Sequence, residues 1–166
     1  MTRLHLLTAL ALAGAIGCAA PALREDSGAE ARALAAEGRF PEAVSEIEQA
    51  VAREPLDPEL RREAARIQWL AGDLPRGILH LEEALEQAPE NPDLWLDLAG
   101  MERSRENLQD AYVAYRRASE LAPDDLRAVS GLALTADALG FDEEASAAYA
   151  RWNELERGGG GGGAPR

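Results

Sequence analysis

The sequence predicts an all-α fold, an α-solenoid of about four helix-turn-helix units, and two observations lead to this prediction. First, landmark residues recur every 34 positions along the chain. The sets that keep this interval are Pro55, Pro89 and Pro123; Ala50, Ala84 and Ala118; Ala43, Ala111 and Ala145, with Gly77 in the open position; and Gly38, Gly72 and Gly140, with Glu106 in theirs. Second, apolar residues such as Leu94, Leu98 and Met101 fall three and four positions apart, which is a helical period.

Caps and prolines predict where the helices begin and end. Asp57-Pro58 and Asn91-Pro92 each supply a capping side chain followed by a proline, whose missing N–H costs nothing at the first helical position. The prolines of the 34-residue set end the preceding helices, because a proline ring cannot continue an interior turn. Ser27 and Glu30 have the spacing of a capping box, which predicts that the first repeat helix opens at Ser27.

The chain begins with a segment typical of an export signal. Residues 1–17 contain Arg3 and then an apolar run from Leu4 to Ile16, which is too short to cross a membrane and has the length of a signal-peptide core. Gly17-Cys18 resembles the end of a bacterial lipobox, which implies cleavage before Cys18 and a lipid on this cysteine. Cys18 is the only cysteine, so it cannot form an internal disulfide. The alternative is an ordinary cleaved signal peptide in which Cys18 is incidental.

Two further segments flank the repeats. Residues 18–26 are short and polar enough to serve as a lipidated tether, and residues 27–157 form the repeat domain. Residues 158–166 begin with six glycines, which cannot bury apolar surface, so a disordered tail is expected there.

Composition and motifs argue against several functions. The net charge of -13 disfavours nucleic acid, whose phosphates need a positive surface. His80 is the only histidine after the export segment and has no cysteine partner, so no zinc site is expected. Acid pairs such as Glu143-Glu144 point about 100° apart on a helix and do not converge. We therefore expect no catalytic residue, no metal and no cofactor.

The residues described above are similar to those of the tetratricopeptide repeat family. With each closing proline at position 32, the frames are 24–57, 58–91, 92–125 and 126–159, and Trp95 and Leu98 match the family's first-helix pattern. In the last frame Arg157 replaces the proline, which fits a helix that closes the stack. The resemblance implies that first-helix positions 2, 5, 9, 12 and 13 line a concave binding face.

Transferred to this sequence, those positions predict a peptide groove enriched in arginine. Its residues are Arg32, Arg62, Arg66, Trp69, Leu70, Leu96, Arg103 and Arg127. Because arginine can form bidentate hydrogen bonds with carboxylates, we expect a partner segment with an acidic end, and we expect Trp69 to serve as an apolar anchor. The alternative is that these arginines pair with nearby acids or face solvent without a partner.

The resemblance implies a non-catalytic scaffold for protein–protein interaction. With a lipid on Cys18, the expected location is the bacterial cell envelope, and Ala19 beside the cysteine favours the periplasmic face of the outer membrane. Similar lipoproteins assist assembly of outer-membrane proteins, pili or cell-wall machinery. The alternatives are a soluble periplasmic or secreted adaptor with unlipidated Cys18, and an accessory subunit of an envelope enzyme.

Overall fold

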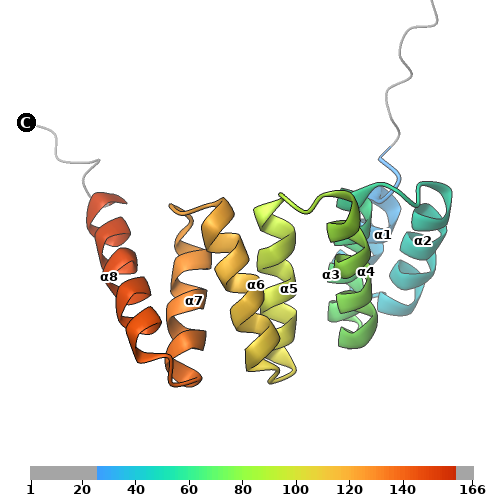
Figure 1. Cartoon of the computed structure of the whole chain (residues 1–166). Coiled ribbons are helices and arrows are strands. Elements are labelled where there is room, and N and C mark those ends of the chain that lie inside the picture. Colours follow the sequence, from blue (N-terminus) through green and yellow to red (C-terminus); the bar gives the residue numbers. More distant parts are fainter. Residues whose placement is uncertain (1–25, 160–166) are drawn as a thin grey trace, which may run out of the picture.

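A computed structural model describes residues 26–159 and shows a row of helices without β-strands in that range (Figure 1). The helices are α1 (Ala29–Ala36), α2 (Phe40–Arg53), α3 (Pro58–Leu70), α4 (Leu74–Gln87), α5 (Pro92–Ser104), α6 (Leu108–Leu121), α7 (Leu126–Ala138) and α8 (Asp142–Gly159). The predicted all-α class is therefore confirmed.

Successive helices form four hairpins that stack side by side in chain order (Figure 1). Each hairpin packs its first helix against its own second helix, and the second helix also packs against the first helix of the next hairpin. The described ends of the chain consequently lie at opposite ends of the row. This arrangement is the solenoid that the 34-residue period predicts.

Small residues at equal intervals set how closely the two helices of a hairpin approach. Ala43 and Ala111 are fully buried, and a Cβ added to Gly77 would lie 3.0 Å from the Ala65 carbonyl oxygen and 3.1 Å from the Met101 sulfur. Larger side chains fill the space beside them; Leu81, for example, has no exposed surface. Burial of one such side chain stabilises the fold by roughly 1.5–3 kcal/mol.

The turn inside each hairpin contains one residue with a left-handed backbone. Gly38, Gly72 and Gly140 have φ angles of 76°, 87° and 75°, and Glu106 has a φ angle of 65° at the equivalent position. Glycine adopts this conformation without a steric penalty, whereas glutamate does not. The 34-residue spacing therefore reflects a backbone requirement, which Glu106 meets under strain.

The helix starts confirm most of the predicted caps. The Asp57 carboxylate accepts hydrogen bonds from the backbone N–H groups of Glu59 and Leu60, and the Asn91 side chain accepts one from Asp93. Helices α2, α4 and α6 end two residues before the prolines of the 34-residue set, as predicted.

The predicted capping box at Ser27 is wrong. Gly28 is the residue that precedes α1, and no side chain caps this helix. The Ser27 hydroxyl instead donates a hydrogen bond to Glu54, at the end of α2. The Ser27 side chain, which the sequence pattern predicts to cap α1, is therefore held by a contact with a residue far away in the sequence.

Several expectations concern residues at the chain ends. The export segment, Cys18 and most of the tether fall in residues 1–25, outside the described residues, as do tail residues 160–166. Helix α8 continues through Arg157 to Gly159, two residues beyond the predicted end of the repeat domain. Within residues 26–159, no helix is both long and apolar enough to cross a membrane.

Candidate functional site

The first helices of the hairpins, α1, α3, α5 and α7, carry all eight residues of the predicted groove. We call the surface of these four helices that carries the eight residues the first-helix face. Arg32 lies on α1, Arg62, Arg66, Trp69 and Leu70 on α3, Leu96 and Arg103 on α5, and Arg127 on α7. The arginines among them differ sharply in what they contact.

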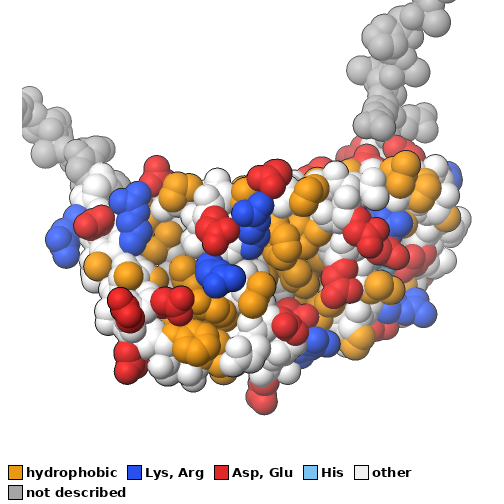
Figure 2. All heavy atoms as spheres, viewed as in Figure 1, with side chains coloured by type: hydrophobic (Ala, Val, Ile, Leu, Met, Phe, Trp, Pro, Cys, Tyr) orange, Lys and Arg blue, Asp and Glu red, His pale blue; other side chains and the backbone are white. Residues whose placement is uncertain are grey.

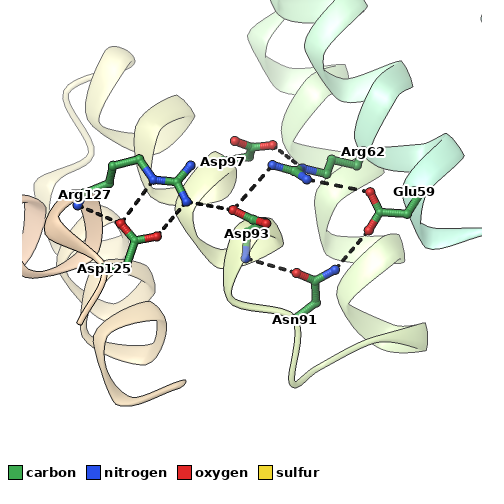
Figure 3. A network of polar contacts seen from close by, with 7 residues as sticks. All are labelled: Glu59, Arg62, Asn91, Asp93, Asp97, Asp125 and Arg127. Carbon is green, nitrogen blue, oxygen red and sulfur yellow. Dashed lines mark hydrogen bonds and ion pairs between the residues drawn. The ribbon is translucent and has the colours of Figure 1, made fainter. Parts of the chain in front are cut away.

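Arg62 is held by two carboxylates of the next repeat and one of its own helix. Its Nε donates a hydrogen bond to Asp97 over 2.6 Å, and its terminal nitrogens lie 3.8 Å from Asp93 and 3.7 Å from Glu59 (Figure 3). Partial burial is the largest single effect and opposes the charged form, but the hydrogen bond to Asp97 and the nearby carboxylates together outweigh it and raise the pKa of Arg62. Arg62 thus ties α3 to α5.

Arg127 makes the matching connection from the other side. It donates to Asp125, the residue that caps its own helix, over 2.6 Å and to Asp93 on α5 over 3.0 Å, so Asp93 lies between two arginines (Figure 3). The hydrogen bond from Arg127 lowers the pKa of Asp125, which also caps α7. The hydrogen bond to Asp125 in turn raises the pKa of Arg127.

The contacts of Arg62 and Arg127 with Asp93, Asp97 and Asp125 form a row along the first-helix face, which we call the polar ladder. Asn91 extends it by donating a hydrogen bond to Glu59 over 3.0 Å (Figure 3). Arg32 likewise contacts a carboxylate, that of Asp26. Three of the five arginines predicted to bind a partner are therefore already paired with acids of this chain. Arg62 and Arg127 in this way link neighbouring repeats.

A pocket opens on the first-helix face between α5, α6 and α7. It has a volume of about 300 Å³. Its lining residues are Leu96, Asp97, Arg103, Tyr115, Arg127, Ser130, Gly131 and Leu134. We call it the first-helix pocket; three of the predicted groove residues lie in it.

Tyr115 and Gly131 shape this pocket together. A Cβ added to Gly131 would lie 2.3 Å from a ring carbon of Tyr115, so only glycine lets the ring take its place. Tyr115 is 6% exposed, and its hydroxyl forms no hydrogen bond with any described residue. Burial raises the pKa of Tyr115, so the hydroxyl stays a neutral donor at physiological pH.

Arg103 differs from the paired arginines because no described carboxylate contacts it. Its guanidinium lies over the Tyr115 ring, 6.0 Å from the centroid. This position leaves the N–H groups of Arg103 available to an anion while the ring stabilises the charge. The pocket therefore offers an unpaired cation beside the apolar side chains of Leu96 and Leu134. It also contains the Asp97 carboxylate, which accepts a hydrogen bond from Arg62.

Apolar side chains lie exposed on the same face. Trp69 is 47% exposed, Leu70 is 58% exposed and Leu134 is 45% exposed. Arg66, also exposed, forms no hydrogen bond or ion pair within residues 26–159. Arg66 and Arg103 are thus the two groove arginines that remain unpaired in the part of the chain that the structure describes.

Acid and histidine side chains elsewhere have structural contacts. The described residues include no group of three or more His, Cys, Asp or Glu side chains that could hold a metal ion. The Nε2 atom of His80 lies 3.1 Å from Glu48, which also accepts a hydrogen bond from Gln68 over 2.7 Å. This cluster connects α2, α3 and α4 in the interior of the array.

Sequence reasoning missed Tyr115, Gly131 and Leu134 as pocket residues. Tyr115 belongs to the core cluster that contains Ala99 and Ala128, and it also lines the pocket. The available indication is Gly131, because the same position holds Glu63 and Asp97 in the two preceding repeats.

Known proteins support this architecture. The sequence profile described as "Tetratricopeptide repeat" matches residues 29–92 and 71–125. No curated protein matches the sequence. Among solved structures, MamA has a TM-score of 0.70 at 17% identity, with 76% of this chain and 74% of MamA aligned. MamA from Desulfovibrio magneticus RS-1 gives a TM-score of 0.68 at 19% identity, with 77% of this chain and 72% of that protein aligned.

Two further solved structures are of peptide-binding proteins. YrrB, a protein with an unusual peptide-binding site, has a TM-score of 0.67 at 21% identity, covering 77% of this chain and 66% of YrrB. The first repeat domain of RPAP3, bound to the HSP90 peptide SRMEEVD, has a TM-score of 0.62 at 17% identity, with 67% of this chain and 88% of that domain aligned. At these identities the likeness shows the fold. Because the profile matches more than half of the chain and the fold agrees, the chain belongs to the tetratricopeptide repeat family.

Proposed function

We propose that this protein is a non-catalytic scaffold that holds a partner protein through the first-helix face. The observation that carries the proposal is Arg103, unpaired among the described residues and placed above Tyr115, in a pocket that Leu96 and Leu134 also line. The partner we propose is a segment that places a carboxylate on Arg103 and the Tyr115 hydroxyl, with an aliphatic side chain between Leu96 and Leu134. The peptide bound by RPAP3 and the peptide-binding site of YrrB support this general mode of action.

The physical basis is a charge-assisted hydrogen bond in a sheltered site. Such bonds between guanidinium and carboxylate are about twice as strong as neutral ones. The chain's net charge of -13 repels an acidic partner at long range, but charges beyond roughly 8 Å are screened at physiological salt. Local contact with Arg103, and with exposed Arg66 on the same face, therefore decides whether an acidic segment binds.

A peptide array tests this role. We expect bound peptides to be enriched in carboxylates, and we expect Arg103→Glu to weaken binding by at least about tenfold, since it places like charges together. Arg76→Glu is the matched control, because Arg76 is an exposed arginine of α4 outside this face. Bound peptides without a preference for carboxylates, or equal binding by Arg103→Glu and the unmodified chain, would refute the proposal.

We further propose that the scaffold is tethered to the bacterial envelope through a lipid on Cys18, at the periplasmic face of the outer membrane, and acts in envelope assembly. The apolar run Leu4 to Ile16 followed by Gly17-Cys18 supports this proposal. Two or more acyl chains give stable anchoring without help from a basic patch, which suits a chain with a net charge of -13.

Detergent partitioning of cell extracts tests the tether. We expect the unmodified protein in the detergent phase, and we expect Cys18→Ser to block cleavage and so to give an unprocessed, slower-migrating band that still carries the apolar run Leu4 to Ile16. If the unmodified protein partitions into the aqueous phase, it is instead a periplasmic or secreted adaptor. The peptide array distinguishes the two failures, because binding by the repeats does not depend on Cys18.

A further inference from the structure

A second pocket lies where α6, α7 and α8 meet. It has a volume of about 360 Å³, and Val129, Leu132 and Ala148 are among its apolar lining residues. Figure 2 shows apolar side chains between the charged ones in this part of the molecule. We call it the second-helix pocket. It shares no lining residue with the first-helix pocket.

The 34-residue period shows what fills this place at the other two junctions between repeats. Arg61, Trp95 and Val129 occupy equivalent positions. The Nε of Arg61 donates a hydrogen bond to the Pro55 carbonyl over 2.8 Å, and the indole Nε1 of Trp95 donates one to the Pro89 carbonyl, also over 2.8 Å. A planar group with an N–H donor therefore closes each of those junctions.

The third junction lacks this planar group. Val129 is too short to cover the junction and has no side-chain N–H, and the equivalent Pro123 carbonyl accepts no hydrogen bond from residues 26–159. Trp95 packs against two core clusters, one that includes Leu85 of α4 and one that includes Ala114 of α6. Where Trp95 has this ring, the third junction has an open pocket.

Two other substitutions enlarge the same space. Leu85 belongs to a core cluster against which Trp95 packs, and the equivalent residue one repeat later is the smaller Ser119. Val113 is likewise replaced one repeat later by the smaller Ala147. Both Ser119 and Ala147 line the second-helix pocket. The pocket thus results from three smaller side chains around one position, while the carbonyl that accepts the indole N–H is retained.

We propose that the second-helix pocket binds the tryptophan side chain of a partner protein. An indole would pack on the apolar side chains of this pocket, whose lining also includes Arg116, Glu144 and Arg151. It would supply the N–H that the Pro123 carbonyl lacks, as Trp95 does for Pro89 one repeat earlier. Trp95 is itself only partly buried, so a ring in the equivalent place remains attached to a chain that passes outside. Burial of an aromatic ring is also a common source of binding energy at protein interfaces.

The probe for this proposal is N-acetyltryptophanamide, titrated into the full chain labelled with nitrogen-15. We expect amide shifts at Val129, Leu132 and Ala148, together with nuclear Overhauser contacts from the indole to the methyl groups of Ala147 and Ala148. N-acetylphenylalaninamide, which has no ring N–H, is expected to bind at least about threefold more weakly, because it leaves the Pro123 carbonyl unpaired.

A variant that fills the pocket provides the decisive comparison. Val129→Trp is expected to weaken probe binding by at least about tenfold and to raise the thermal midpoint, since it restores the packing seen around Trp95. Leu79→Trp is the matched control: it adds the same ring on an exposed position of α4 and leaves binding unchanged.

Absence of shifts at the pocket residues of the unmodified chain would overturn the proposal, and so would undiminished binding by a folded Val129→Trp variant. The Overhauser contacts need no variant, so they test the site even if Val129→Trp fails to fold. Arg103→Glu is expected to leave probe binding unchanged, which separates this site from the proposed function of the first-helix face.

Discussion

Replacement of Glu106 by glycine is predicted to stabilise the protein. Glu106 has a φ angle of 65° in the turn between α5 and α6, where the other hairpins have glycine. A non-glycine residue in this region is destabilised by about 1–2 kcal/mol. Glycine also gives the unfolded chain more freedom, which offsets about 0.4–1 kcal/mol of the gain. The expected net stabilisation is therefore about 0.5–1 kcal/mol.

Thermal unfolding followed by circular dichroism measures this effect. For a domain of this size, a gain of about 1 kcal/mol corresponds to a rise of roughly 2–4 °C in the midpoint. Glu106→Ala is the control for charge, because it removes the carboxylate and keeps the left-handed residue non-glycine. Gly72→Ala is the reverse experiment, since a Cβ there meets nothing within 4 Å and only the backbone, with φ of 87°, is strained.

Backbone strain at Glu106 requires a definite order of midpoints: Glu106→Gly above the unmodified chain, and Gly72→Ala below it. If Glu106→Ala raises the midpoint as much as Glu106→Gly, the cause is charge and not backbone strain. If Glu106→Gly leaves the midpoint unchanged, contacts around the turn have already relieved the strain. The hydrogen bonds that buried Glu102 accepts from Arg105 and Asn107 are the contacts to examine in that case.

Three further predictions follow from the packing and the polar ladder. Gly131→Ala is expected to destabilise the fold by about 2–3 kcal/mol in chemical denaturation and to disturb the first-helix pocket, because the new methyl group would overlap the Tyr115 ring. An unchanged unfolding midpoint would contradict the pocket geometry. Arg62→Ala is expected to lower the free energy of unfolding by about 1 kcal/mol, because it leaves Asp93 and Asp97 of α5 without this partner; this value already allows for the partial exposure of the ion pairs. An unchanged free energy of unfolding would show that the polar ladder does not couple the repeats. The pKa of Asp125 is lowered by Arg127, so its contribution to stability is present above the unfolded pKa of about 3.9 and is lost as pH falls through the lower folded value. Asp125→Asn, which keeps a capping side chain, should show a smaller loss of thermal midpoint between neutral and acid pH, and an identical pH profile would contradict this assignment.

The period of the sequence is sufficient to predict the hairpins, because each of its landmarks has a local physical cause. Proline ends a helix, aspartate or asparagine caps the next one, and glycine permits the left-handed turn residue. Even the exception at Glu106 takes the same backbone conformation as the glycines. The prediction for Ser27 is wrong because its hydroxyl finds Glu54, 27 residues away, and local pattern alone contains no information about that contact.

The site residues are only partly predictable. The sequence identifies which arginines lie on the first helices, but it does not show which of them are paired. Arg62 and Arg127 meet Asp93 and Asp97 at separations of 31 to 35 residues, about one repeat, so side-by-side stacking decides their partners. The two pockets depend on substitutions within the repeat, Gly131 in one and Val129 in the other, whose effect appears only when neighbouring helices are in place.

The central claim, that the first-helix pocket holds an acidic segment of a partner, is tested most directly by a photo-cross-linking residue at Leu134 in living cells. Leu134 lines the pocket and is 45% exposed, and Leu79, 53% exposed on α4, is the control position. We predict an adduct from position 134 that maps by mass spectrometry to a carboxylate-rich segment and disappears when Arg103 is replaced by glutamate. An adduct from position 134 that persists with Arg103→Glu, or equal adducts from both positions, would contradict the account.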